Sequence, residues 1–236
     1  MWFLLFAYFI ALSSGSPDEL DEPTEEHHIC EEHPYTACEA LNLEKFLFPE
    51  NEEEFAKLCV VVKSYVECMH KYSKACNIKI FPAAGEYESI NSLVSEVCDK
   101  DTLLHKAYLL SAPCYEYAVY NLSEVCFEPV AELFYDIEVQ MALDSLHTPH
   151  KNPEYLGTAK LKCLENVVIV SCVAEYAAIN CLTYAGQATV EIARRSYYVT
   201  DCPTETVKEL LIALWKLDTY RPLKNSLIRT LEGITF

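Results

Sequence analysis

Cysteine spacing is the feature that most constrains how this chain can fold. The segment CVVVKSYVECMHKYSKAC (59–76) places three cysteines at steps of nine and eight residues, in a run whose apolar residues recur at helical intervals. On a helix, nine residues rise about 13.5 Å and make about two and a half turns, whereas the Cα atoms of a disulfide lie within about 7 Å. Cys59 and Cys68 therefore cannot bond to each other and must be tied to segments on opposite sides of the helix.

A second segment has the same frame. Residues 163–181 read CLENVVIVSCVAEYAAINC, with steps of nine and nine. One interval of 104 residues separates three pairs of cysteines: Cys59 and Cys163, Cys68 and Cys172, Cys98 and Cys202. Such a regular offset predicts an internal repeat of two six-cysteine units. The unit cysteines are Cys30, Cys38, Cys59, Cys68, Cys76 and Cys98, then Cys114, Cys126, Cys163, Cys172, Cys181 and Cys202.

The cysteines of each central helix need partners outside it. We expect these partners to be Cys30, Cys38 and Cys98 in the first unit and Cys114, Cys126 and Cys202 in the second. The spacing leaves the connectivity within each unit open. Tyr72 and Tyr176 each follow a central cysteine by one helical turn, so each ring should lie beside a disulfide.

The composition predicts an all-α fold. Only 5 of the 236 residues are Gly, and tight hairpins depend on glycine. We expect the central helices at 52–75, with Asn51 as N-cap, and at 153–181, with Asn152 as N-cap. The helix at 153–181 is rich in valine and isoleucine and has almost no polar face, so it should be largely buried. Further helices are expected at 35–46, 89–97, 102–111, 128–146, 183–198, 205–217 and 222–231, with loops at 80–88 and 147–152.

The beginning of the chain is typical of a secretory signal peptide. MWFLLFAYFIALSSGSP has an apolar run too short to span a bilayer, followed by small residues, and we expect cleavage after Gly15. In a secreted chain, an even number of cysteines favours disulfides over free thiols. We therefore predict an extracellular protein with a signal peptide at 1–15, an acidic arm at 16–29, six-cysteine helical units at 30–113 and 114–203, and a helical tail at 204–236 packed on the body.

The net charge of −18 limits the classes of partner. It argues against nucleic acid and against anionic membranes, because both are bound through Lys and Arg. The apolar stretch 167–186 carries Glu175 and Asn180, so we interpret it as a buried helix and expect no membrane span in the mature chain. Asn121 begins the Asn-Leu-Ser sequon and is the expected N-glycosylation site.

Chemistry-bearing motifs are few. The segment EEHHICEEH (25–33) contains metal-ligating residue types, but adjacent ligands lack the spacing of a zinc site and Cys30 is needed for a disulfide. No Gly-x-Ser-x-Gly, His-Glu-x-x-His or glycine-rich phosphate motif occurs in the sequence. His70, His105, His147 and His150 have no partner at a useful spacing. We therefore predict no catalytic residue, metal site or cofactor, and a protein that is not an enzyme.

The cysteine frame resembles that of a known family. LCVVVKSYVECMHKYSKAC and KCLENVVIVSCVAEYAAINC, each with flanking cysteines, resemble the cysteine-rich secreted proteins of arachnids and nematodes grouped as domain of unknown function number 19. The resemblance covers most of the mature chain, once per unit, and the insertion at 127–162 departs from it. It implies a disulfide-bonded helical extracellular protein of an invertebrate, with no activity or catalytic residues to transfer.

Three functions fit these features. The leading hypothesis is a binding protein of haemolymph, venom or a gland secretion, whose stapled helices enclose a pocket for a hydrophobic small molecule. The second is a venom or secreted effector that acts on an extracellular protein, which predicts an exposed apolar and aromatic patch and no internal cavity. The third is a component of silk or matrix, which predicts intermolecular cross-links.

Overall fold

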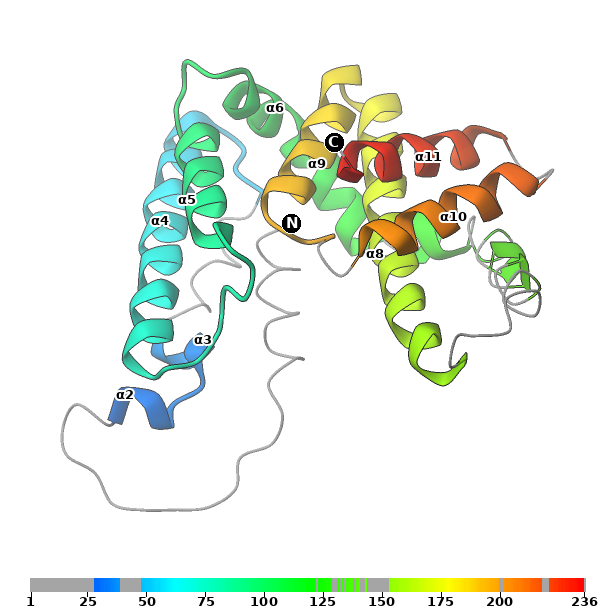
Figure 1. Ribbon diagram of the computed structural model, residues 1–236. Helices are drawn as coiled ribbons and strands as arrows, with labels where there is room; N and C mark the ends of the chain where they lie inside the picture. Colours follow the sequence, from blue (N-terminus) through cyan, green and yellow to red (C-terminus); the bar gives the residue numbers. More distant parts are fainter. Residues whose placement is uncertain are drawn as a thin grey trace. The chain divides into compact units, whose positions relative to one another are not determined.

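The computed structural model describes residues 28–38, 48–121, 123–128, 153–199, 202–217 and 221–235, together with 131, 133, 135–137, 139–140 and 143. In this part of the chain the regular elements are helices, and no strand occurs (Figure 1). The predicted all-α, disulfide-stapled fold is confirmed. The chain divides into two compact units, Met1–Pro113 and Cys114–Phe236. The predicted signal peptide at 1–15, and nearly all of the arm at 16–29, lie outside the described residues.

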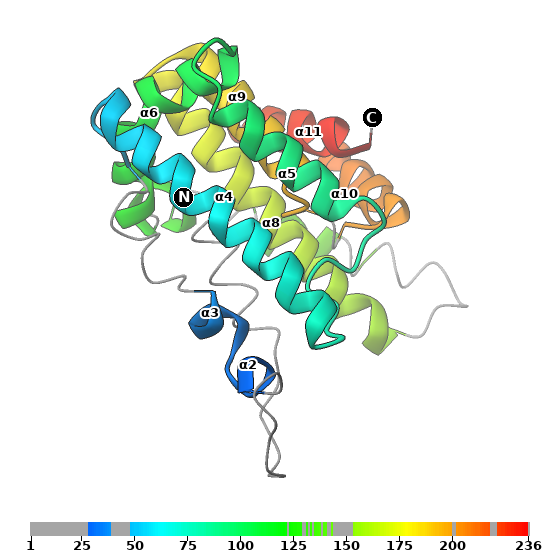
Figure 2. The same ribbon diagram turned by 90° about the vertical axis from the view of Figure 1, so that its left-hand side faces the viewer.

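The first unit is organised around α4 (Glu52–Ala75), whose bounds match the prediction. Asn51 is its N-cap: the side-chain oxygen accepts a hydrogen bond from the backbone N–H of Glu54 at 3.0 Å. Three glutamates fill the first turn, where the helix dipole favours negative charge. The helix α4 packs against α5 (Glu86–Val97), which runs beside it in Figure 2. It also contacts the short α2 (His28–Glu31).

Buried side chains recur along α4 at steps of three and four residues. This spacing places them on one stripe of the helix. The stripe consists of Phe55, Leu58, Cys59, Val62, Tyr65, Val66, Met69 and Tyr72. Ile90, Leu93, Val94 and Val97 of α5 supply the matching buried stripe. The apolar interior of the first unit therefore lies between these two helices.

The second unit is built on α8 (Pro153–Asn180), which packs against α9 (Thr183–Arg195) and the C-terminal α11 (Arg221–Thr235). Residues 166–174 are all buried, so this part of α8 has no exposed face, as predicted. Within the described residues, the segment Lys162–Asn180 is long and apolar enough to cross a membrane, and about two thirds of it is buried. Burial of this kind is typical of the central helix of a helical core.

The C-terminal helices belong to the core of the second unit. The helix α10 (Thr204–Lys216) packs on α11, and α11 packs on α8. The Ser171 hydroxyl of α8 donates a hydrogen bond to the Thr230 hydroxyl at 2.8 Å, and the Ser226 hydroxyl donates to the Ser171 carbonyl at 3.2 Å. These contacts are buried or partly buried, as expected for a tail that packs intramolecularly.

The structure corrects several predicted helix bounds. The helix α6 (Leu103–Tyr120) continues through Pro113, so the predicted end at residue 111 is wrong. Proline removes one backbone hydrogen bond, at a cost of about 3 kcal/mol, but the residues after it are held by the Cys114–Cys181 disulfide and by a hydrogen bond from the Tyr115 hydroxyl to the Ala185 carbonyl. The helix α9 ends at Arg195 and not at 198, because Tyr197 takes a left-handed backbone conformation (φ 59°).

Other bounds differ by smaller amounts. The helix α5 begins at Glu86, three residues earlier than predicted, directly after Gly85. Gly85 has φ 76°, a backbone conformation that glycine adopts without a Cβ penalty. The predicted helix at 35–46 begins as α3 (Pro34–Ala37), and its remainder lies outside the described residues from 39 onward. Most of the predicted helix at 128–146, which follows the π-helix η3 (Ser123–Phe127), and the loop at 147–152 also lie outside them.

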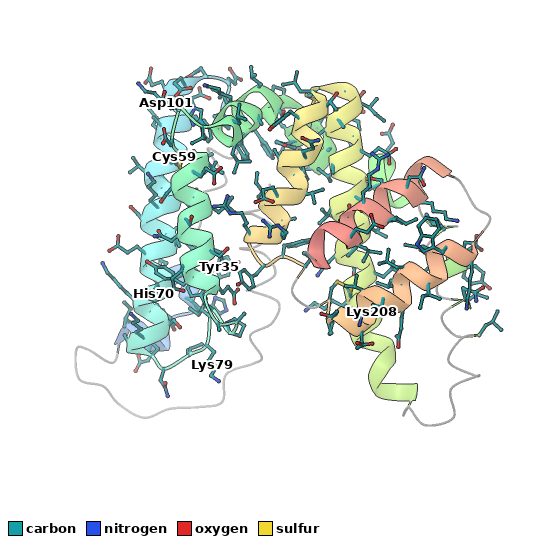
Figure 3. The ribbon with its side chains drawn as sticks, turned by 45° about the horizontal axis from the view of Figure 1, so that its top comes forward. Tyr35, Cys59, His70, Lys79, Asp101 and Lys208 are labelled. Atoms are coloured by element: carbon teal, nitrogen blue, oxygen red, sulfur yellow. A yellow bond between two sulfur atoms is a disulfide. The ribbon has the colours of Figure 1, made fainter. Side chains whose placement is uncertain are left out.

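All twelve cysteines are paired, and each unit holds three of the bonds. Cys59 joins α4 to the end of α5, and its side chain is labelled in Figure 3. Both units pair their first cysteine with the fifth, the second with the fourth and the third with the sixth. The pairs are Cys30–Cys76, Cys38–Cys68 and Cys59–Cys98, then Cys114–Cys181, Cys126–Cys172 and Cys163–Cys202.

Gly186 lets α9 approach α8 closely. A Cβ at this position would lie 2.6 Å from the Ala174 carbonyl oxygen and 2.9 Å from the Ala178 Cβ. We expect Gly186→Ala to lower the free energy of unfolding by about 1–3 kcal/mol, because the backbone of α8 must shift. Urea unfolding followed by circular dichroism measures this, with Gln187→Ala, at the exposed neighbouring position, as control. If both variants had the same free energy of unfolding, the close approach of α9 to α8 at Gly186 would be contradicted.

Candidate functional site

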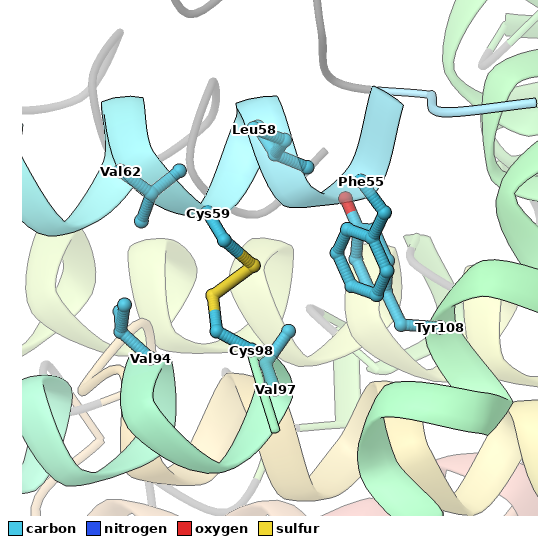
Figure 4. A pocket seen from close by; sticks show the side chains of 8 residues that line it. All are labelled: Phe55, Leu58, Cys59, Val62, Val94, Val97, Cys98 and Tyr108. Atoms are coloured by element: carbon cyan, nitrogen blue, oxygen red, sulfur yellow. A yellow bond between two sulfur atoms is a disulfide. The ribbon is translucent and has the colours of Figure 1, made fainter. Parts of the chain in front are cut away.

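The cavity in the interior of the first unit has no room for a small-molecule ligand. It lies between α4, α5 and Tyr108 and has a volume of about 10 Å³. It is lined by apolar side chains and by the Cys59–Cys98 disulfide (Figure 4). A space of this size holds about one water molecule, whereas ligand pockets span about 300–1,000 Å³. The disulfide and the aromatic rings fill the space that an apolar ligand would need.

A wider but open groove runs along the outer side of α4. Its volume is about 450 Å³, and Ile29 of α2 forms one wall. The groove floor is chemically mixed: Glu67 and Lys71 form an ion pair at 2.7 Å, and Tyr72 donates a hydrogen bond to the Glu32 carbonyl at 2.7 Å. The Glu67 and Lys71 side chains are exposed and the Tyr72 ring is buried, so the groove presents a polar, solvent-facing floor and not an apolar pocket.

His105 forms a buried polar contact that no spacing motif in the sequence indicates. Its Nδ1 lies 3.0 Å from the Val97 carbonyl oxygen, and its Nε2 lies 3.1 Å from a carboxylate oxygen of Glu52. Each ring nitrogen therefore faces one oxygen atom of a neighbouring helix. The ring also packs on Phe55, with centroids 4.5 Å apart. With both nitrogens engaged, His105 ties α4, α5 and α6 together.

The other candidate residues from the sequence take structural roles or lie outside the described residues. His70, which is labelled in Figure 3, stacks on Tyr87 with ring centroids 3.6 Å apart. His33 is the N-cap of α3, and its ring nitrogen accepts a hydrogen bond from the Tyr35 N–H. His147 and His150 are not among the described residues. Across the part of the chain that the structure describes, no three His, Cys, Asp or Glu side chains are grouped to hold a metal ion.

Two tyrosines are buried deeply enough to titrate abnormally. Burial raises the pKa of Tyr65 far above its usual range, and the nearby Tyr35 adds to the effect. Burial also raises the pKa of Tyr198, with a further contribution from the negative charge of Glu165. Tyr198 is therefore part of the core of the second unit.

These tyrosines predict alkaline unfolding. The unfolded chain ionises its tyrosines near pH 10, whereas the folded chain keeps Tyr65 and Tyr198 protonated, so stability is full below about pH 10 and falls as the pH rises above it. Absorbance of the phenolate and circular dichroism, recorded together during a pH titration, should show unfolding that coincides with late tyrosine ionisation. In the Tyr65→Phe/Tyr198→Phe variant, no late tyrosine ionisation should accompany the loss of the helical signal. The prediction would be contradicted if every tyrosine ionised near pH 10 while the helical signal stayed unchanged.

An exposed cluster of aromatic and apolar side chains lies on the second unit. Tyr117 of α6 stacks on Tyr176 of α8, with centroids 5.7 Å apart and an interplanar angle of 11°. Tyr120 and Ile179, one turn further along these two helices, are each 73% exposed. We call these four residues the tyrosine patch. Tyr117 is itself 47% exposed, so the stacked pair is accessible at the surface.

A rigid frame holds the tyrosine patch. The Cys114–Cys181 disulfide joins α6 to the end of α8, three residues before Tyr117 on α6. The buried Tyr115 hydroxyl donates to the Ala185 carbonyl and accepts from the Thr189 hydroxyl, both at 3.1 Å, which ties α6 to α9. The backbone that carries the exposed rings is thus fixed by one covalent and two hydrogen bonds.

The surroundings of the patch are acidic. Glu116 and Glu124 are exposed. Burial raises the pKa of Tyr176, and the Tyr117 phenol and the negative charge of Glu124 raise it further, so Glu124 acts on the patch electrostatically. Asn121 ends α6 beside these residues, and its side-chain amide donates to the Tyr117 carbonyl at 2.9 Å. The expected glycosylation position is thus next to the patch.

The sequence indicates only part of this cluster. The tyrosines at 115–120 stand out in it, and Tyr176 is expected beside a disulfide, but no pattern brings Tyr117 and Tyr176 together. Comparison with known proteins adds nothing to the site: no family model, curated protein or solved structure matches the chain. The site is therefore defined by the geometry of the described residues.

Proposed function

We propose that this chain is a secreted, non-enzymatic binding protein that acts on an extracellular protein through its surface. Six disulfides within one chain are typical of proteins that mature in an oxidising compartment. The apolar start of the sequence at 1–15 fits export through a signal peptide. Asn121 is then available for glycosylation in the secretory pathway.

The exposed tyrosine patch is the observation that carries this proposal. Tyrosine provides contact area at a low entropic cost and is enriched at binding hot spots. An apolar small molecule needs an enclosed pocket, and the enclosed cavity in the first unit has a volume of about 10 Å³. That cavity leaves no room for such a ligand in the first unit, and the exposed patch of the second unit favours a protein target over the small hydrophobic ligand that we expected first.

Mass spectrometry of the protein purified from its native source tests this proposal. Native spectra should show the glycosylated polypeptide without a bound lipid, and cross-linking in the source fluid should attach a second protein to the second unit. A stoichiometric hydrophobic ligand that is released on denaturation would overturn the proposal in favour of a carrier. Covalent oligomers on non-reducing gels would favour the matrix hypothesis.

A common origin of the two units is part of this proposal. The identical order of disulfide pairing supports it, as does the equal offset that relates Tyr72 to Tyr176. Each of these tyrosines contacts the segment just after its unit's first cysteine: Tyr72 bonds to the Glu32 carbonyl, and Tyr176 stacks on Tyr117. We also propose that the chain is related to the arachnid and nematode family grouped as domain of unknown function number 19.

A further inference from the structure

We infer that the tyrosine patch binds a basic, Arg- and Lys-rich segment of the partner protein. This inference rests on the proposed function and specifies the chemistry of the partner. It combines three properties of the patch: its exposed aromatic rings, the sign of the charge around them and the rigidity of the helices that carry them.

The aromatic rings suit cationic side chains. An arginine guanidinium or a lysine ammonium is attracted to the face of an aromatic ring, and guanidinium also stacks on it. Tyr120 is 73% exposed, and the Tyr117–Tyr176 stack presents further ring surface next to it. The exposed Ile179 supplies apolar area for the methylene stem of a long basic side chain.

The stretches of sequence that carry the patch contain acidic residues and no basic ones. The patch comes from two stretches of sequence, 114–150 and 163–193, and neither contains a Lys or an Arg. Among the described positions, Glu116, Glu124 and Glu128 are exposed in this region. A basic segment is therefore attracted by these exposed carboxylates and meets no like charge from the two stretches that carry the patch.

Rigidity lowers the entropic cost of the contact. The Cys114–Cys181 disulfide and the Tyr115 hydrogen bonds fix the helices before a partner arrives. A preorganised surface loses little conformational freedom on binding. By contrast, a second copy of this chain would bring the same acidic region against itself, and like charges across an interface oppose association.

Binding of a defined probe tests the inference. The probe is a fluorescent peptide of alternating arginine and glycine, titrated with the full disulfide-bonded protein, and its anisotropy is measured at low and at physiological salt. Tyr117→Ala/Tyr120→Ala removes the exposed rings without changing the charge, and should weaken binding by about tenfold or more at both salt concentrations. Ile212→Ala/Trp215→Ala is the matched control, because these α10 residues are 52% and 65% exposed in the same unit. The control should bind as the unchanged protein does.

A second pair of variants tests the charge. Glu124→Gln should weaken binding and reduce its salt dependence, whereas Glu88→Gln, at an exposed position of the first unit, should do neither. Equal affinity of all variants would overturn the inference, because attraction would then come from the net charge of −18 alone. Loss of self-association in the tyrosine variant, seen by sedimentation, would overturn it in favour of a second copy.

The outcome separates this inference from the proposed function. If the native partner is cross-linked to the patch but is not basic, and the arginine peptide does not bind, the proposed function stands and this inference fails. If a hydrophobic small molecule occupies the purified protein, the proposed function fails whatever the peptide does. Circular dichroism of each variant confirms that the fold is retained before binding is compared.

Discussion

Reduction of the disulfides is expected to unfold both units. Each bond contributes roughly 2–4 kcal/mol by restricting the unfolded chain, and a whole domain is stable by about 5–15 kcal/mol. Six bonds are present, three in each unit. Far-ultraviolet circular dichroism and thermal melting, recorded with and without a strong reductant and with alkylation of the released thiols, measure the effect.

The physical reason lies in how the bonds are distributed along each central helix. In the first unit, α4 is tied at three points, to α5 through Cys59, to the end of α3 through Cys68 and to α2 through Cys76. The short α2 and α3, each of four residues, have too few buried contacts to stay docked alone. Alkylated protein that keeps its helical signal and a cooperative melt would show that the helical core is sufficient without the bonds.

Phe55→Ala is expected to destabilise the first unit more than any other single substitution proposed above. The Phe55 side chain is 1% exposed, and it stacks on Tyr108 with centroids 5.3 Å apart and packs on His105 at 4.5 Å. Truncation of a buried phenylalanine costs about 3–5 kcal/mol, because apolar contact is lost and a cavity remains. Chemical unfolding of the first unit, followed by circular dichroism, should show this loss.

Val60→Ala is the matched control on the same helix. Val60 is 67% exposed, so its truncation removes little buried area and should change the free energy of unfolding by less than about 0.5 kcal/mol. The Phe55 variant should also loosen His105, whose contact with Glu52 joins α4 to α6. A Phe55 variant as stable as the Val60 variant would mean that the interior of the first unit repacks freely.

Local sequence chemistry predicted the central helices accurately. The bounds of α4 and its Asn51 cap follow from residues within one or two turns of each other, so no distant contact is needed to fix them. Helical geometry also excluded a bond between Cys59 and Cys68 and directed each to a flanking partner, which the structure bears out. For the same reason the buried character of α8 could be predicted from its composition.

Features that depend on distant residues could not be predicted in this way. The helix α6 passes Pro113 because the residues beyond it are anchored by Cys181 and Ala185, about seventy positions later in the chain. The His105–Glu52 contact joins residues 53 positions apart, and no spacing motif marks it. The packing of the helices decides whether α6 continues past Pro113 and which side chain contacts His105.

The sequence by itself determined that this chain forms helices stapled by disulfides, because helix periodicity, caps and cysteine steps are short-range properties. The tertiary structure decided which cysteines pair and where aromatic side chains gather at the surface. Tyr117 and Tyr176 meet because the Cys114–Cys181 disulfide joins α6 to the residue that follows α8. A binding surface made from two helices is a property of their packing, and periodicity along either helix alone does not contain it.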